Sequence, residues 1–123
     1  MVAGSQPLSD MTVLVVEDSW QLAEVMQRAL ERAGARVVGP AGTLAEAERL
    51  AAGSAIDAAV MDLDLGGRPA DPLAERLADA GVKVVLLTAY ARPSALAEKV
   101  HAYLSKPAKP QDLIAALQKP LHR

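Results

Sequence analysis

The chain has 123 residues, no cysteine and a formal net charge of −2, with 13 basic and 15 acidic side chains. This length suits a single domain, the lack of cysteine excludes disulfides and thiolate metal sites, and the mixed charge argues against a nucleic-acid-binding module. No apolar run reaches the roughly 18 residues that span a bilayer, and residues 1–10 lack the layout of a signal peptide. We therefore expect a cytoplasmic protein in which residues 1–10 are a flexible leader and residues 11–123 form one domain, with no output domain.

Apolar runs that suit strands alternate with segments of helical spacing along the chain. Thr12–Val16 is continuously apolar, as is typical of a strand buried on both faces. Ser19–Ala33 has apolar residues at helical spacing, including Leu22 and Val25, and Gly34 ends it. In chain order we expect strand 12–16, helix 19–33, strand 36–38 ended by Gly39-Pro40, helix 43–53, strand 58–61, loop 66–69, helix 71–80, strand 82–87, helix 93–100, strand 102–104 and helix 111–119.

Five strands that alternate with five helices predict an α/β fold, with a doubly wound parallel sheet covered by helices on both faces. In such sheets, ligands bind beyond the carboxyl ends of the strands. For the order 2-1-3-4-5, the first, third, fourth and fifth strands are neighbours. Polar residues follow each of them: Glu17 and Asp18 after the first strand, Asp62 and Asp64 after the third, Thr88 after the fourth and Lys106 after the fifth.

The clustering of acids at this edge needs an explanation. Two carboxylates about 4 Å apart repel by roughly 4 kcal/mol at an effective dielectric constant near 20. A bound divalent cation removes this cost, and oxygen ligands without His or Cys favour Mg²⁺, with Mn²⁺ also possible. A carboxylate can attack phosphorus to form an acyl phosphate, so we expect Asp62 to accept a phosphoryl group. The metal, Lys106 and Thr88 would then each bind one of the three phosphoryl oxygens.

Four short motifs carry a resemblance to a known family. Val-Val-Glu17-Asp18, Met-Asp62-Leu-Asp64, Leu-Leu-Thr88-Ala89 and Leu-Ser-Lys106-Pro107 together resemble the receiver domain of bacterial two-component response regulators. The resemblance covers almost the whole chain after Met11 and implies a flavodoxin-like fold. It also implies phosphoryl transfer from a sensor histidine kinase or a histidine phosphotransfer protein, and output by protein contact or service as a phosphate sink or relay, without binding of nucleic acid or membrane.

The resemblance assigns a role to each matching residue. Asp62 is the phospho-acceptor, Asp18 is the main metal carboxylate, and Glu17 helps directly or through water. Asp64 occupies the position whose backbone carbonyl binds the metal. Thr88 and Tyr103 match the switch pair, Lys106 matches the lysine that supports catalysis, and the Lys106-Pro107 peptide bond is expected to be cis.

The chain departs from the family pattern in three places. The 18 positions from Thr88 to Lys106 (106 minus 88) are fewer than in a typical receiver, which predicts a shortened or irregular fourth helix and favours a monomer over the usual dimer. Ala108 replaces the usual aromatic residue after Lys-Pro. Thr88-Ala-Tyr90 is similar to the Thr-Gly-Tyr signature of a group of single-domain receivers from alphaproteobacteria.

Three alternatives stay open at this point. Asp62-Leu-Asp64 also resembles the nucleophile motif of haloacid-dehalogenase-like phosphatases, although that family places the motif on its first strand. A flavodoxin-like cofactor binder would need phosphate-binding loops rich in Gly, Ser or Thr. A receiver-like adaptor that is never phosphorylated would not need the full acidic set. If the resemblance to receiver domains holds, we expect the protein to catalyse its own phosphorylation and dephosphorylation and no other reaction.

Overall fold

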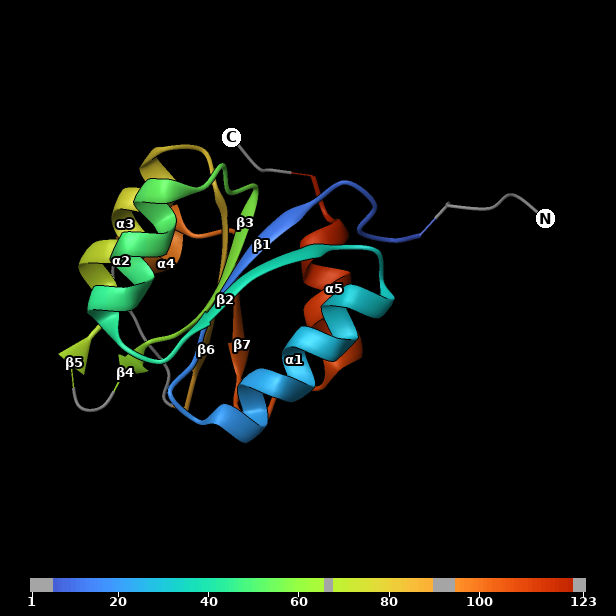
Figure 1. Ribbon diagram of the computed structural model, residues 1–123. Coiled ribbons are helices and arrows are strands. Elements are labelled where there is room, and N and C mark those ends of the chain that lie inside the picture. The colour runs from blue at the N-terminus through green and yellow to red at the C-terminus, as the bar shows by residue number, and fades with distance from the viewer. Residues whose placement is uncertain (1–5, 66–67, 90–94, 121–123) are drawn as a thin grey trace.

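The core of the protein is a five-stranded parallel sheet (Figure 1), seen in a computed structural model that describes residues 6–65, 68–89 and 95–120. The strands are β1 (Thr12–Val16), β2 (Arg36–Ala41), β3 (Ala58–Asp62), β6 (Lys83–Thr88) and β7 (Ala102–Ser105). Their order is β2-β1-β3-β6-β7, which confirms the predicted order 2-1-3-4-5. The carboxyl ends of β1, β3, β6 and β7 therefore lie along one edge.

Helices cover both faces of the sheet (Figure 1). One face is covered by α1 (Trp20–Arg32) and α5 (Pro110–Gln118), and the other by α2 (Leu44–Gly53), α3 (Asp71–Asp79) and α4 (Ala95–Lys99). Within the described part of the chain, no helix is both long and apolar enough to cross a membrane.

Alternating strand residues build two separate cores, because successive side chains of a strand point to opposite faces of the sheet. Val13 and Val15 of β1 pack with Leu30 and Leu117 of the helices on the α1–α5 face. Leu14 and Val16 pack on the other face, and all of these strand residues are fully buried. This burial on both faces is what the continuous apolar run at residues 12–16 predicts.

β2 runs further than its sequence predicts. It continues through Gly39 and Pro40 to Ala41, and the register with β1 shifts between the pairs Leu14–Val38 and Val16–Ala41. Gly39 makes this irregularity possible: its φ is +97°, and a Cβ there would lie 2.8 Å from the Ala41 nitrogen. The prediction that Gly39-Pro40 ends the strand is therefore wrong.

The segment after β3 also differs from its prediction. Asp64–Leu65 (β4) pairs antiparallel with Arg68–Pro69 (β5), so the expected loop at 66–69 is partly a small hairpin. The short fourth helix is confirmed, because within the described residues α4 spans Ala95–Lys99. Residues 93 and 94, which were expected to begin it, lie outside the described residues.

Part of the predicted leader packs against the domain. Leu8 is 1% exposed and belongs to the core on the α1–α5 face. The Leu8 N–H donates to Ala33 O at 2.8 Å, and Gln6 Nε2 donates to Arg32 O at 3.1 Å, so both residues cap the C-terminal end of α1. The expectation of a flexible stretch is wrong for residues 6–10, because Leu8 has a buried site to occupy.

The C-terminal end of α5 is tied to the beginnings of β6 and β7. Lys83 Nζ donates to Leu117 O at 3.1 Å and to Lys119 O at 2.5 Å, and His101 Nε2 lies 3.0 Å from Ala116 O. Burial lowers the pKa of His101, with the nearby Lys83 charge adding to this effect against the hydrogen bond to Ala116. His101 is thus a half-buried structural residue.

Candidate functional site

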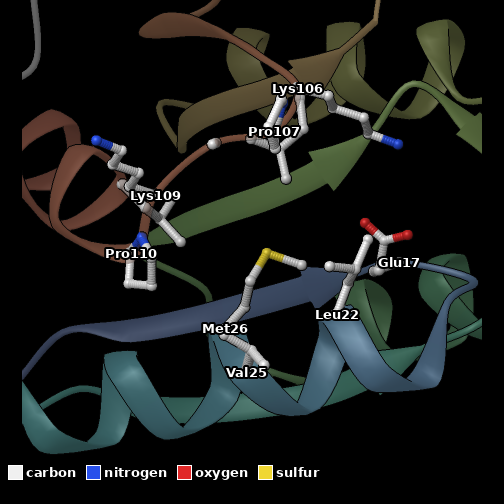
Figure 2. A pocket seen from close by; sticks show the side chains of 11 residues that line it. Glu17, Leu22, Val25, Met26, Lys106, Pro107, Lys109 and Pro110 are labelled. Carbon is white, nitrogen blue, oxygen red and sulfur yellow. The ribbon is translucent and has the colours of Figure 1, made fainter.

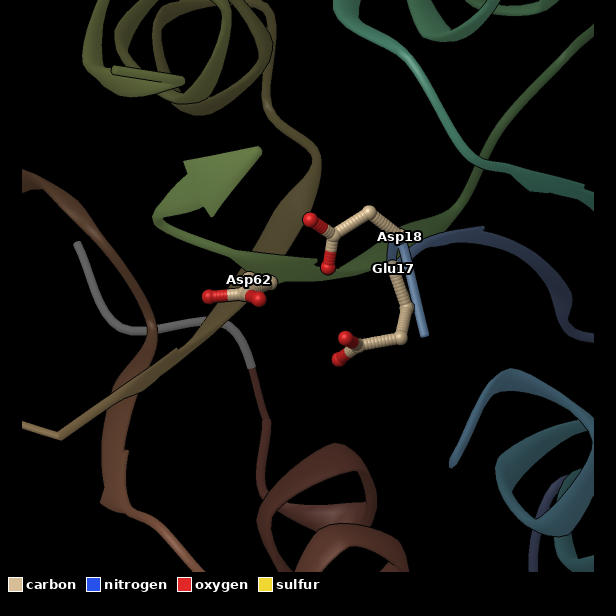
Figure 3. A group of neighbouring side chains, drawn as sticks. All are labelled: Glu17, Asp18 and Asp62. Atoms are coloured by element: carbon tan, nitrogen blue, oxygen red, sulfur yellow. The ribbon is translucent and has the colours of Figure 1, made fainter. Parts of the chain in front are cut away.

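Three carboxylates meet at the carboxyl ends of β1 and β3 (Figure 3). One oxygen atom from each of Glu17, Asp18 and Asp62 lies within 4.8 Å of the others. Glu17 and Asp62 are buried, at 3% and 4% exposure, whereas Asp18 is exposed. The sheet order produces this cluster, because β1 and β3 are paired in parallel and both end at this edge.

The backbone holds Glu17 in place but leaves one of its oxygens unpaired. The Glu17 N–H donates to Ala41 O at 2.9 Å, and Glu17 Oε2 accepts the Ser19 N–H at 3.2 Å. Glu17 Oε1 is buried and has no hydrogen-bond partner. Burial raises the pKa of Glu17 from 4.5 to about 7; the Ser19 hydrogen bond lowers it by a smaller amount, and the charge of Asp62 raises it further.

Lys106 brings the positive charge of the site. The Lys106 Nζ lies 2.8 Å from Asp62 Oδ2. The backbone N–H of Lys106 donates to Thr88 O at 2.8 Å, which fixes the lysine at the end of β7. Burial alone would lower the pKa of Lys106, but the hydrogen bond and charge of Asp62, together with Glu17 and Asp18, raise it above its ordinary value. The peptide bond between Lys106 and Pro107 is cis, as predicted.

Thr88 and Tyr103 lie on neighbouring strands, with Tyr103 opposite Leu86 in the register of β6 and β7. Thr88 is buried at the end of β6. Tyr103 packs against the core beneath α2, α3 and α4, and its hydroxyl is buried without a hydrogen-bond partner. By alternation from Leu86, which lies in the same core, Thr88 projects to this face of the sheet as well.

The acidic cluster fits a divalent cation. It offers oxygen donors only, and hard cations such as Mg²⁺ prefer these. The unpaired, buried Glu17 Oε1 is costly to keep without a partner. A cation held by Asp18, Asp62 and Glu17 would remove both this cost and the mutual repulsion of the carboxylates.

A family model for the response regulator receiver domain matches residues 13–118. The chain belongs to this family. The match covers both strands that carry the acids and the strand that leads to Lys106, so the receiver motifs and the observed cluster coincide. No curated protein matches the chain.

Solved receiver structures resemble this one. A response regulator from Burkholderia pseudomallei, described with a phosphorylated aspartic acid, a calcium ion and citrate, is 32% identical with a TM-score of 0.76; the match covers 88% of this chain and 66% of that one, just under two thirds. A receiver domain from Methanospirillum hungatei is 24% identical with a TM-score of 0.79, covering 88% and 90% of the two chains. The second likeness concerns the fold alone.

Two residues of the predicted receiver site lie partly or wholly outside the described part of the chain. Asp64 begins β4, two residues after Asp62, but its side chain is not described, and the role of its carbonyl stays a prediction. Tyr90, which completes the Thr-Ala-Tyr signature, lies outside the described residues, so similarity to the alphaproteobacterial group also stays a prediction.

A cavity that the sequence does not predict lies beside the site (Figure 2). Leu22 and Val25 of α1 are 50% and 52% exposed, although their helical spacing suggested burial. They line a cavity of about 360 Å³ between α1 and the segment from Lys106 to Leu113, which we call the α1–α5 groove. The sequence feature that could have predicted this groove is the wide apolar stripe on α1, because α5 covers only part of that stripe.

Proposed function

We propose that this receiver domain accepts a phosphoryl group on Asp62 from a sensor histidine kinase or a histidine phosphotransfer protein, in a Mg²⁺-dependent reaction. The observation that carries the proposal is the position of Asp62: its carboxylate meets those of Glu17 and Asp18 within 4.8 Å and lies 2.8 Å from Lys106 Nζ. The phosphorylated aspartic acid described for the Burkholderia pseudomallei relative supports the same chemistry.

Asp62 would act as the nucleophile. One of its carboxylate oxygens forms a bond to phosphorus, while the bond from phosphorus to the imidazole nitrogen of the donor breaks and leaves its electron pair on that nitrogen. The product is an acyl phosphate on Asp62. The catalytic contribution of the protein is mainly positioning and charge stabilisation, because the transition state spreads charge over the phosphoryl oxygens.

The neighbouring residues would stabilise that charge. Lys106 keeps its ammonium group beside the accepting carboxylate, and the Thr88 hydroxyl donates a hydrogen bond to a phosphoryl oxygen. Asp18 would hold Mg²⁺, with Glu17 helping directly or through water and the Asp64 carbonyl completing the protein ligands. Bound Mg²⁺ would neutralise charge on the transferring group.

The output would follow from Thr88 and Tyr103, which share one face of the sheet. Movement of Thr88 toward the phosphoryl group would open space beside Tyr103, whose buried hydroxyl has no partner to hold it in place. We propose that this change alters a surface for protein contact. Service as a phosphate sink or relay would need no such change. A haloacid-dehalogenase-like phosphatase is not favoured, because Asp62 ends the third strand of the chain and not the first.

Intact-mass measurement after treatment with acetyl phosphate tests the proposal. With Mg²⁺, the wild-type protein should gain the mass of one phosphoryl group, and Asp62→Asn should gain none. Asp79→Asn, an exposed acid on α3, is the matched control and should be labelled like the wild type. Equal labelling of Asp62→Asn, or full labelling with EDTA in place of Mg²⁺, would refute the proposal.

A further inference from the structure

The α1–α5 groove has the size and lining of a small-molecule site. Its volume of about 360 Å³ lies at the lower end of the range for ligand pockets, roughly 300–1,000 Å³. Leu22, Val25 and Met26 line it from α1, and Ala108 and Leu113 line it from the opposite wall. Such walls favour an apolar ligand, because covering the half-exposed Leu22 and Val25 removes apolar surface from water.

One end of the groove is polar and is lined by Glu17. Figure 2 shows the Glu17 carboxylate at this end, next to Leu22 and beneath Lys106. Glu17 is 3% exposed, and its Oε1 has no hydrogen-bond partner. A buried acceptor without a partner is unfavourable, so a ligand that donates a hydrogen bond here would correct a local deficit.

The charges around this end favour a cation. Asp18 and Asp62 each bring a carboxylate oxygen within 4.8 Å of a Glu17 oxygen, and Lys106 is the positively charged group beside them, with its Nζ on Asp62 Oδ2. Three carboxylates thus face one ammonium group. Lys109, the other positively charged residue that lines the groove, is exposed, and in Figure 2 its ammonium group points away from Glu17.

We propose that the α1–α5 groove binds amphipathic amines, with the ammonium group on the Glu17 carboxylate and the apolar body between α1 and α5. The ligand class follows from the lining of the groove: a buried acid lies at one end, and apart from Lys106 and Lys109 the remaining walls are apolar. Ala108 contributes to the available space, because a larger side chain at this position would extend into it.

The amine and Mg²⁺ would compete, and this consequence rests on the proposed function. Both cations use Glu17 and the charge of its two neighbours. Because linkage is reciprocal, each must weaken the binding of the other by the same factor. An amphipathic amine would therefore oppose phosphorylation of Asp62 without reacting with it.

Binding of 4-phenylbutylamine, followed by backbone NMR shifts at pH 8 in the absence of Mg²⁺, tests the inference. We expect saturable shifts around Leu22, Val25 and Ala108, and binding weakened at least tenfold by Glu17→Gln, which removes the charge, and by Ala108→Leu, which fills the groove. Glu24→Gln is the matched control on α1, since its exposed carboxylate pairs with Arg28, and it should bind like the wild type. The alcohol 4-phenylbutanol should bind more weakly than the amine.

Several outcomes would overturn the inference. These are the absence of saturable binding at millimolar amine, unchanged affinity in Glu17→Gln or Ala108→Leu, and 4-phenylbutanoate binding as tightly as the amine. Loss of phosphotransfer from a donor protein in Ala108→Leu without amine binding would instead assign the groove to protein contact. Acetyl phosphate labelling without amine tests the proposed function separately: labelling without amine binding refutes the inference alone, and amine binding without labelling refutes the proposed function alone.

Discussion

The buried Glu17 makes the stability of the metal-free domain depend on pH. Its pKa rises from 4.5 to about 7 on folding, chiefly through burial. Between these pH values the folded state holds a proton that the unfolded state has released, so stability falls as pH rises through this window. A shift from 4.5 to about 7 corresponds to about 3 kcal/mol at 1.36 kcal/mol per unit.

Glu17→Gln should remove this dependence, because glutamine resembles the protonated carboxyl but cannot ionise. We expect the variant to match the wild type near pH 4.5 and to exceed its free energy of unfolding by up to about 3 kcal/mol at pH 8. Urea unfolding with EDTA at both pH values measures the difference. Glu24→Gln, on the surface of α1, should keep the wild-type profile, and a parallel profile for Glu17→Gln would show that burial does not hold its proton.

At this scale, the sequence predicts the meeting of Glu17, Asp18, Asp62 and Lys106, because each lies at or just after the end of a strand and the strand order brings these ends together. Exposure is harder to predict. Trp20, a large aromatic residue at the start of α1, is 71% exposed. Its exposure depends on which segments reach the first turn of α1 in the folded chain, and local spacing does not encode that.

At the scale of elements, the end of α1 depends on the segment before β1. Helices leave their last carbonyl groups without intrahelical partners. Gln6 and Leu8 supply donors to Arg32 and Ala33, and Gly34, with φ of +101°, turns the chain beneath them. A Cβ on Gly34 would lie 2.9 Å from Gln6 atoms, so the turn and the segment fit together.

Leu8→Ala should therefore destabilise the domain by about 2–5 kcal/mol, as expected for a fully buried leucine. Thermal or urea unfolding measures this loss. Asp10→Asn is the matched control in the same segment and should be nearly neutral, because it is exposed and Asn tolerates its φ of +66°. A neutral Leu8→Ala would mean that the segment behaves as the flexible leader that its sequence suggests.

Most element types follow from periodicity, and the failures have particular causes. Gly39-Pro40 is a good stop signal, yet the pairing of Ala41 with Val16 carries β2 past it. Arg68 and Pro69 read as a loop because the two-residue strands β4 and β5 are too short to show alternation. Leu8 was assigned to a leader because one apolar residue in a polar stretch has no period.

At the scale of the whole molecule, metal binding should stabilise the fold. A ligand that binds only the folded state raises its stability in proportion to the logarithm of its concentration above Kd. Excess Mg²⁺ should raise the melting temperature of the wild type, and Asp18→Ala should lose most of this increase. Trp20 lines a shallow pocket with Glu17 and Asp18, so its fluorescence should change with the same midpoint. An unchanged Mg²⁺ response in Asp18→Ala would remove this residue from the metal site.

The ties of α5 to the sheet give this helix one fixed end. Lys83 and His101 hold the carbonyl groups of its last turn, and its first turn follows the segment from Pro107 to Lys109 beside the acidic site. A shift of Lys106 toward a phosphoryl group would pull on the first turn only. We therefore expect α5 to pivot about its fixed C-terminal end, so that a small displacement at Lys106 would widen or narrow the space between α1 and α5.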